Sequence, residues 1–229
     1  MSEIRNHLQK ADNTAELAIY WDWDGCIAKT IHLWIGEYTK TFEKEGIVKT
    51  RAEVISSNGA FLADIQSWGY SFAEAKCMVD ATHARVVGQL PDAELYPGAL
   101  ETIQTLGARG YRQAIVTTSK QHYLQPALQR HGLEDHFQAI VAGDHVEHGK
   151  PHRESIDRAH TLLGGLASRG VLIGDSKKDL QTATNAGIPS ILYYPPENEE
   201  FYSLHELRAY NPTYEVRDMA EIVPLIESL

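Results

Sequence analysis

The sequence predicts an α/β fold in which a parallel sheet is covered by helices on both faces and carries a helical insertion after its first strand. Three observations predict this. Short apolar runs rich in branched residues stop at glycine or polar residues, as buried strands do. From residue 97 onward such runs alternate with helical patterns, the order expected of a parallel sheet. Between residues 34 and 96 the alternation stops and only helical patterns remain.

Five runs have the strand pattern, and each is brief and bounded by glycine or polar residues. They are residues 17–21, 114–116, 139–142, 171–173 and 190–194. The helices between them are indicated by apolar residues three or four apart, with glycine after the last. These apolar stripes are Leu100, Ile103 and Leu106; Tyr123, Leu124, Ala127 and Leu128; and Ile156, Ala159, Leu162 and Leu163.

Two segments complete the chain. In the insertion, an aromatic stripe with a spacing of four and a Ser-x-x-Glu capping box each indicate a helix. The residues are Trp34, Tyr38 and Phe42, which we expect in the insertion's own core, and Ser71 with Glu74. Residues 195–212 mix polar and aromatic side chains, so we expect a surface connection that could hold one short helix. A second capping box, at Asp218 and Glu221, begins a last helix.

The composition excludes several classes of protein. The chain has 229 residues, 43% hydrophobic and 23% charged, which is typical of one globular protein. Its net charge of −10 argues against nucleic acid or an anionic membrane as a partner. No apolar run could span a bilayer, and the first residues lack the apolar core of a secretory signal. Two cysteines, Cys26 and Cys77, make no disulfide framework, so we expect a cytoplasmic protein.

Reactive side chains follow four of the expected strands. The segments are Asp22-Trp23-Asp24-Gly25, Thr117-Thr118-Ser119, the loop with Lys150, and Gly174 through Asp179. In a parallel sheet, ligands bind in the crevice beyond the carboxyl ends of the strands, so we expect these side chains to meet there. Gly25 lets the backbone turn and approach an anion, and the hydroxyl cluster at a helix start suits phosphate oxygens.

Their chemistry is complementary. Carboxylates from Asp22, Asp24 and Asp175 in one crevice would repel each other, and Mg²⁺ resolves this because it prefers oxygen ligands and a substrate phosphate. One carboxylate can attack phosphorus and form an aspartyl-phosphate, while another protonates the leaving oxygen and then activates water. Lys150 would offset the charge on nucleophile and phosphate. The pattern therefore predicts Mg²⁺-dependent phosphatase chemistry on a small phosphorylated metabolite.

Each motif also has a purely structural interpretation. Asp-x-Asp-Gly could be a turn with solvated carboxylates, Thr-Thr-Ser could be an N-cap, and Gly-Lys-Pro could be a loop. Gly-Asp-Ser-x-x-Asp could be a helix cap whose acidic residues in the first turn interact favourably with the helix dipole. Their occurrence in this order at successive strand ends favours the functional interpretation. The histidines of residues 131–160 lack the spacing of a known zinc motif, so we expect solvated loops. His83 and Arg85 suit the end of a helix dipole, and contact with substrate is the alternative.

These motifs resemble those of the haloacid dehalogenase-like hydrolase superfamily, in its phosphatase branch, from about residue 17 to the end. The resemblance implies that Asp22 is the nucleophile and Asp24 the acid/base. It makes Thr117 the second-motif hydroxyl and Lys150 the third-motif lysine. An acid at position 24 argues for phosphate esters, since the dehalogenases and phosphonate hydrolases of this superfamily lack one there.

The resemblance also implies the remaining site residues. The fourth-motif acids are Asp175, a direct ligand of Mg²⁺, and Asp179, in its outer shell. The metal site is then Asp22, Asp24 (through its backbone carbonyl), Asp175 and Asp179, and the phosphate site is Gly25, Thr117, Thr118 and Lys150. The insertion resembles the helical cap of the superfamily's first class. This implies a Rossmann-like core of residues 1–33 and 97–229 and a cap of residues 34–96.

Three positions depart from the superfamily pattern. Cys26 stands where Thr is frequent, Lys29 where many members have Asp, and Arg153 where Pro is frequent. None of them is a matched catalytic residue. We interpret Cys26 as a small buried apolar side chain, with a redox-sensitive thiol as the alternative.

Two other functions fit the same motifs. A sugar phosphomutase on this scaffold would return the phosphoryl group to a sugar instead of water. A non-catalytic phosphoacceptor module also uses an Asp at a strand end with Mg²⁺, Thr and Lys, but it is about half this length and has no such insertion. The residue pattern leaves the particular substrate and the oligomeric state open.

Overall fold

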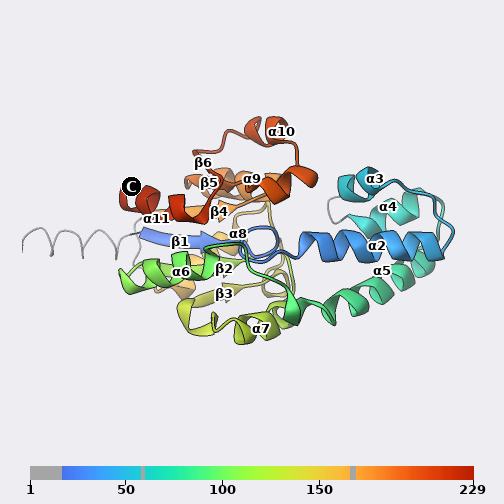
Figure 1. The fold of residues 1–229 in the computed structure, drawn as a ribbon, viewed down its shortest axis with the longest axis horizontal. Helices are drawn as coiled ribbons and strands as arrows, with labels where there is room; N and C mark the ends of the chain where they lie inside the picture. The colour runs from blue at the N-terminus through green and yellow to red at the C-terminus, as the bar shows by residue number, and fades with distance from the viewer. Residues whose placement is uncertain (1–16, 58–59, 166–168) are drawn as a thin grey trace, which may run out of the picture. The chain divides into compact units, whose positions relative to one another are not determined.

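The computed structural model describes residues 17–57, 60–165 and 169–229. These residues form two compact units, shown as ribbons in Figure 1. One unit contains the described residues up to Lys29 together with Glu94–Leu229, and the other is Thr30–Ala93. In the described part of the chain, no helix combines the length and the apolar character needed to cross a membrane.

The first unit is built on a sheet of six parallel strands in the order β3-β2-β1-β4-β5-β6. The strands are β1 (Leu17–Trp21), β2 (Arg112–Val116), β3 (Ala139–Val141), β4 (Arg169–Gly174), β5 (Ser190–Tyr193) and β6 (Tyr214–Val216). The five expected strands are confirmed to within two residues at each end. The sequence pattern missed β6 because the charged Glu215 interrupts its two apolar residues, whereas the equally short β3 is an uninterrupted apolar run.

Helices cover both faces of this sheet, as expected (Figure 1). They are α6 (Ala99–Ala108), α7 (Gln121–Arg130), α8 (Glu154–Leu162), α9 (Lys177–Ala186), α10 (Leu204–Arg208) and α11 (Ile222–Glu227). Ile19 and Trp21 of β1 belong to a core cluster with side chains of α6, α7 and α11. The alternate residues Ala18 and Tyr20 belong to a second cluster with α8 and α9. Because successive side chains of a strand point to opposite faces, β1 is buried on both sides.

The segment 195–212 corrects one expectation. It holds a short 3₁₀ helix, Pro196–Glu200, followed by α10. The side chain of Asn198 within it is fully buried, so the segment is not merely a surface connection. The polar sequence around Asn198 gave no sign of this, because burial here depends on hydrogen bonds to residues distant in sequence.

Thr30–Ala93 form a helical unit, and the described residues of this range contain no strand. Its α-helices are α2 (Ile31–Lys44), α3 (Arg51–Ser56), α4 (Phe61–Ser67) and α5 (Phe72–Val87). The capping box at Ser71 and Glu74 is present and begins α5. Tyr38 and Phe42 are buried in the unit's core, and the Tyr38 ring stacks on Phe61 with 3.4 Å between centroids. Trp34 is only partly buried, so that part of the expected core is wrong.

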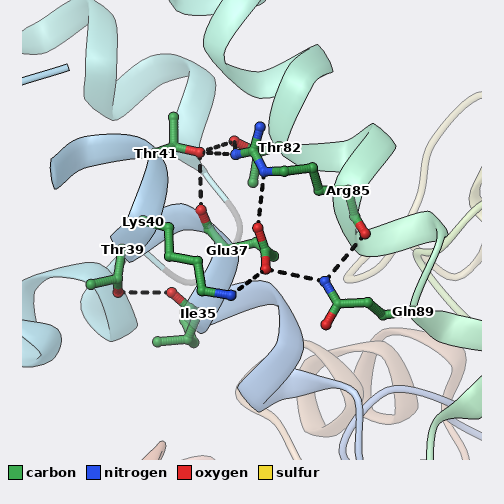
Figure 2. A network of polar contacts seen from close by, with 8 residues as sticks. All are labelled: Ile35, Glu37, Thr39, Lys40, Thr41, Thr82, Arg85 and Gln89. Carbon is green, nitrogen blue, oxygen red and sulfur yellow. Dashed lines mark hydrogen bonds and ion pairs between the residues drawn. The ribbon is translucent and has the colours of Figure 1, made fainter. Parts of the chain in front are cut away.

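A polar network joins α2 and α5 within this unit (Figure 2). The carboxylate of Glu37, which is 6% exposed, accepts hydrogen bonds from Lys40 Nζ at 2.6 Å and Arg85 Nε at 2.9 Å. Gln89 Nε2 donates a third at 3.1 Å. Arg85 therefore has a structural partner on α2. His83 also has a partner on α2, because its Nε2 atom is within hydrogen-bond distance, 3.0 Å, of Tyr38 Oη.

We expect this network to stabilise the fold in a pH-dependent way. The hydrogen bond from Lys40, and then those from Arg85 and Gln89, outweigh burial and lower the pKa of Glu37 from 4.5 to about 2. A carboxyl group with a lowered pKa in the folded state stabilises above its usual pKa, and this contribution is lost as the pH falls through the folded value. Glu37→Gln should cost about 1–3 kcal/mol at neutral pH and reduce the acid dependence between roughly pH 5 and 2. Urea unfolding at a series of pH values measures both.

The matched control is Glu43→Gln, because Glu43 lies on the same helix but is exposed. It should change the free energy of unfolding by less than about 0.5 kcal/mol. Equal effects of the two substitutions would show that the network adds nothing specific.

Candidate active site

The expected site residues lie at the carboxyl ends of the central strands of the first unit. Backbone hydrogen bonds continue the sheet one residue past the strands, from Asp22 N to Ile173 O at 2.9 Å and from Thr117 N to Val141 O at 3.0 Å. Asp22 and Asp175 directly follow the last residues of β1 and β4, which are neighbours in the sheet. The chain order of the strands reverses between β1 and β4, and this switch point is where parallel α/β sheets bind ligands.

Three carboxyl groups form a buried cluster there. Asp22, Asp175 and Asp179 each offer an oxygen, and the three oxygens lie within 4.8 Å of one another. The side chain of Lys150 is buried beside them, with Nζ 2.5 Å from Asp22 Oδ1 and 2.5 Å from Asp179 Oδ1. One ammonium group faces three carboxyl groups, so the cluster has excess negative charge when all of them are ionised.

The electrostatics of the cluster follow from this imbalance. Burial, reinforced by the negative charge of Asp179, raises the pKa of Asp22. Burial and then the charge of Asp22 raise the pKa of Asp175 well above its usual range. Burial lowers the pKa of Lys150, but the charges of Asp179 and Asp22 outweigh it and raise that pKa overall, so Lys150 stays an ammonium. A further cation would favour the ionised form of the carboxyl groups.

The donor set fits a hard divalent cation. Asp175 Oδ1 is buried and has no hydrogen-bond partner among the described residues, which is costly unless a cation completes it. Both oxygens of Asp179 are already used, Oδ1 by Lys150 and Oδ2 by the backbone N and Oγ of Ser176. Asp179 therefore suits an outer-shell position, whereas Asp175 suits direct ligation. Carboxylate oxygens are the ligands that Mg²⁺ prefers.

Asp24 is placed differently from the other three acids. Its Oδ2 accepts a hydrogen bond from Ser119 Oγ at 2.6 Å, and its carboxylate is not one of the three that cluster in the described structure. The chain turns directly after Asp24, at Gly25, which has a φ of +85°, a backbone region that residues with a Cβ rarely adopt. The two acids of this motif have different partners, Lys150 for Asp22 and Ser119 for Asp24.

The hydroxyl cluster lies in the loop between β2 and α7. We expected it at a helix start, but α7 begins at Gln121, two residues after Ser119. Thr117 is buried and its Oγ1 accepts a hydrogen bond from Ser119 N at 3.1 Å, while Thr118 is exposed. The structure thus brings Ser119 into the site through Asp24, a role that the sequence pattern did not assign.

Sequence reasoning named Gly174 in the fourth segment without giving it a role, and it missed Asn198. Gly174 allows close packing: a Cβ at this position would lie 2.4 Å from Cγ of Asp179. Asn198 connects three segments, since its Oδ1 accepts from Tyr96 Oη at 2.5 Å and its Nδ2 donates to Gly25 O at 2.9 Å. The same Nδ2 is 3.4 Å from Asp175 Oδ2. Gly174 precedes Asp175 directly and its role could have been found from the Gly-Asp pattern, but Asn198 has no local signal.

Cys26 is fully buried, with Sγ 3.7 Å from Ile173 O. Burial, followed by the charges of Asp22 and Asp175, raises the pKa of its thiol well above the usual value. A neutral buried thiol is a poor nucleophile, so the interpretation of Cys26 as a small packing residue agrees with the structure.

The site combines a buried acidic cluster, one lysine and a hydroxyl-rich loop. It lies at the switch point of a parallel sheet, and these groups suit the binding of a cation together with an anionic group, as in an enzyme. The family of haloacid dehalogenase-like hydrolases matches residues 19–193, about three quarters of the chain. The chain belongs to this family, which confirms the resemblance noted from its motifs. The protein is accordingly an enzyme of the phosphoric monoester hydrolase type.

Similar proteins agree with this assignment. Pyrophosphatase PpaX of Halalkalibacterium halodurans is 29% identical over 212 residues, which cover 91% of this chain and 95% of the relative. CbbY from Rhodobacter sphaeroides, solved in complex with phosphate, has a TM-score of 0.74 at 24% identity and covers 93% of this chain and 99% of its own. A hydrolase of the family from Deinococcus radiodurans, solved with bound phosphate and sodium, has a TM-score of 0.72 at 21% identity, covering 93% and 96%. These structures confirm the α/β fold with its parallel, Rossmann-like sheet.

Proposed function

We propose that this hydrolase is a Mg²⁺-dependent phosphatase that cleaves a small phosphorylated metabolite through an aspartyl-phosphate on Asp22. The observation that carries the proposal is the buried Oδ1 of Asp175, which has no hydrogen-bond partner among the described residues and lies beside the carboxylate of Asp22 and the ammonium of Lys150. When bound by Asp22, Asp175 and the backbone carbonyl of Asp24, with Asp179 in the outer shell, Mg²⁺ would offset negative charge on the phosphate.

The residues divide the chemistry between them. A carboxylate oxygen of Asp22 attacks phosphorus, the bond to the ester oxygen breaks, and Asp24 gives its proton to the leaving alkoxide. Asp24 then takes a proton from water, whose oxygen attacks phosphorus. The bond to Asp22 breaks and inorganic phosphate leaves. Lys150, Thr117, Thr118 and the backbone at Gly25 would hold the phosphoryl oxygens during both steps.

The domain boundaries remain part of the proposal. We propose that residues 34–96 act as a cap that selects the substrate, on a core formed by residues 1–33 and 97–229. We also propose a cytoplasmic location, supported by the free Cys26 and Cys77, which suit a reducing compartment.

A phosphate-release screen tests the proposed reaction. The panel should contain sugar phosphates, nucleotides, phosphoglycolate and pyrophosphate, the last because the relative PpaX is a pyrophosphatase by name. We expect release of inorganic phosphate with Mg²⁺ and none with excess chelator. Isomer formation in the presence of a bisphosphate primer would instead indicate a mutase. Failure to cleave any ester, with Mg²⁺ binding intact, would indicate a non-catalytic module.

Asp175→Ala should weaken Mg²⁺ binding and turnover together, because it removes the buried oxygen that has no other partner. We expect at least a tenfold higher Mg²⁺ requirement, the scale of losses at metal sites. Titration calorimetry measures the binding and phosphate release measures the rate. The exposed Asp135 provides the control, since Asp135→Ala removes one negative charge of the chain without touching the cluster. Unchanged Mg²⁺ affinity in Asp175→Ala would contradict the assigned ligand.

Asn198 is expected to act as a positioning residue for Asp175 and the Gly25 loop. Asn198→Ala removes the hydrogen bonds to Gly25 O and from Tyr96 Oη. It should raise the Mg²⁺ concentration needed for half-maximal rate more than it lowers the rate at saturating Mg²⁺. Tyr96→Phe breaks only the contact with Asn198 Oδ1 and should show a smaller shift in the same direction. An effect of Asn198→Ala on thermal stability alone would leave it a packing residue.

A further inference from the structure

A second group of potential metal ligands lies outside the carboxylate cluster. His148, His152 and Glu154 each offer one ligand atom, and these atoms lie within 4.8 Å of one another. The two imidazoles are exposed and Glu154 is partly buried at the beginning of α8. The sequence pattern suggested only solvated loop histidines here, because the ligands are brought together by a turn and not by helical spacing.

The carboxylate of Glu154 is held in place by the turn before it. Its Oε1 accepts a hydrogen bond from Glu147 N at 2.8 Å and its Oε2 accepts one from His148 N at 2.9 Å. These two backbone bonds also lower the pKa of Glu154, which is therefore an anion at neutral pH. Backbone hydrogen bonds thus hold the Glu154 carboxylate in place. Neither Lys nor Arg donates any of the hydrogen bonds described for it.

The two imidazoles are arranged around this carboxylate. Nδ1 of His148 lies 3.1 Å from Glu154 Oε2, and Nδ1 of His152 lies 4.0 Å from the same oxygen. The rings are 4.9 Å apart between centroids. Their side chains are 61% and 55% exposed, so small ring rotations meet little steric resistance.

The separations suit a tetrahedral transition-metal ion. Bonds of about 2.0–2.1 Å to nitrogen and oxygen place neighbouring ligand atoms about 3.4 Å apart in a tetrahedron. The two distances to Glu154 Oε2 lie on either side of this value. Ligation through Nδ1 of His152 would replace the hydrogen bond that it now accepts from Glu154 N at 3.2 Å, which is a modest cost at an exposed position.

We propose that His148, His152 and Glu154 form a site for Zn²⁺ or a chemically similar transition-metal ion, with water at the remaining position. Imidazole nitrogens suit zinc, copper and nickel, whereas all-carboxylate sites suit Mg²⁺, so the two sites of this chain differ in the metal that they prefer. Lys150 lies between the two histidines in sequence. A metal ion bound here would restrain the same turn that carries Lys150 to Asp22 and Asp179.

Metal binding to the full-length protein tests the proposal without any enzymatic assay. The titration uses Zn²⁺ against a chromophoric chelator, and Co²⁺ for its ligand-field spectrum, in a large excess of Mg²⁺. All variants carry Cys77→Ser, because the exposed thiol of Cys77 is itself a zinc ligand. We expect one ion per chain and a tetrahedral Co²⁺ spectrum. The affinity should fall at least about tenfold in His148→Asn/His152→Asn and in Glu154→Gln.

The matched control is the double substitution His122→Asn/His205→Asn, which removes two other exposed histidines. It should leave the stoichiometric site and the Co²⁺ spectrum unchanged. The proposal is overturned if the parent protein binds no ion, if His148→Asn/His152→Asn binds Zn²⁺ as tightly as the parent, or if the control lowers the affinity equally. Because the readout is metal binding, these outcomes are independent of whether the protein cleaves phosphate esters.

Discussion

Asp22→Asn will abolish turnover and the covalent intermediate, because an amide oxygen cannot replace the carboxylate that attacks phosphorus. The side chain is nearly isosteric, so the variant should fold, as circular dichroism and thermal unfolding can confirm. In the folded wild type, Asp22 Oδ1 is 2.5 Å from Lys150 Nζ, which holds the nucleophile in one orientation. We expect the rate to fall to the background of the assay, with no acid-stable label on the protein after a quench with radioactive substrate.

The location of the label distinguishes the two acids of the first motif. In the wild type, reduction of the quenched phosphoenzyme with tritiated borohydride releases the phosphate and leaves tritium on the reduced side chain, and peptide mapping should find this label at Asp22. Label on Asp24 would reverse the two roles. Substantial turnover by Asp22→Asn would exclude a covalent aspartyl-phosphate on this residue.

Asp24→Asn will lower the rate about 10²–10⁴-fold on alkyl phosphates, the usual contribution of general acid–base catalysis. The substitution keeps the shape of the side chain and removes its proton. The loss in the first chemical step should be smaller for p-nitrophenyl phosphate, because p-nitrophenolate leaves without protonation. Hydrolysis of the phosphoenzyme should also be slower, since the same carboxylate activates water. Rapid-quench kinetics with both substrates separates these steps.

Ser119→Ala is a milder variant with which the effect of Asp24→Asn can be compared. Ser119 Oγ donates a hydrogen bond to Asp24 Oδ2 at 2.6 Å, so its loss should disturb the orientation of Asp24 without removing the proton. We expect a smaller decrease in rate with the same dependence on leaving group. An equal loss for both leaving groups in Asp24→Asn would leave Asp24 without an acid role.

Much of the fold could be predicted because its signals are local. Buried parallel strands appear as short apolar runs, and this identified five of six strands. The capping box at Ser71 identified the start of α5, and the one at Asp218 begins a short 3₁₀ helix, Met219–Glu221, that leads directly into α11. Thr50 and Glu53 form a capping box of the Thr-x-x-Glu pattern at the start of α3. Strand β6 was missed because Glu215 interrupts its apolar residues, and the helix α4 is too short for a period to show.

The candidate site was predictable for a related reason. Parallel strands bring their carboxyl ends to one edge, so reactive residues after successive strands were expected to meet, and Asp22, Lys150, Asp175 and Asp179 do cluster. The different roles of the individual acids were not predictable. Hydrogen bonding leaves an oxygen of Asp175 open, occupies both oxygens of Asp179 and directs Asp24 to Ser119.

The sequence by itself determined the parallel α/β class, the helical insertion and the residue types available at the strand ends, because periodicity and motif order are properties of the chain. Tertiary structure alone decided which groups meet across long separations. Asn198 reaches Gly25 and Tyr96, and Arg85 reaches Glu37. The physical reason is that burial of a polar group depends on partners brought close by folding, and no local pattern encodes those partners.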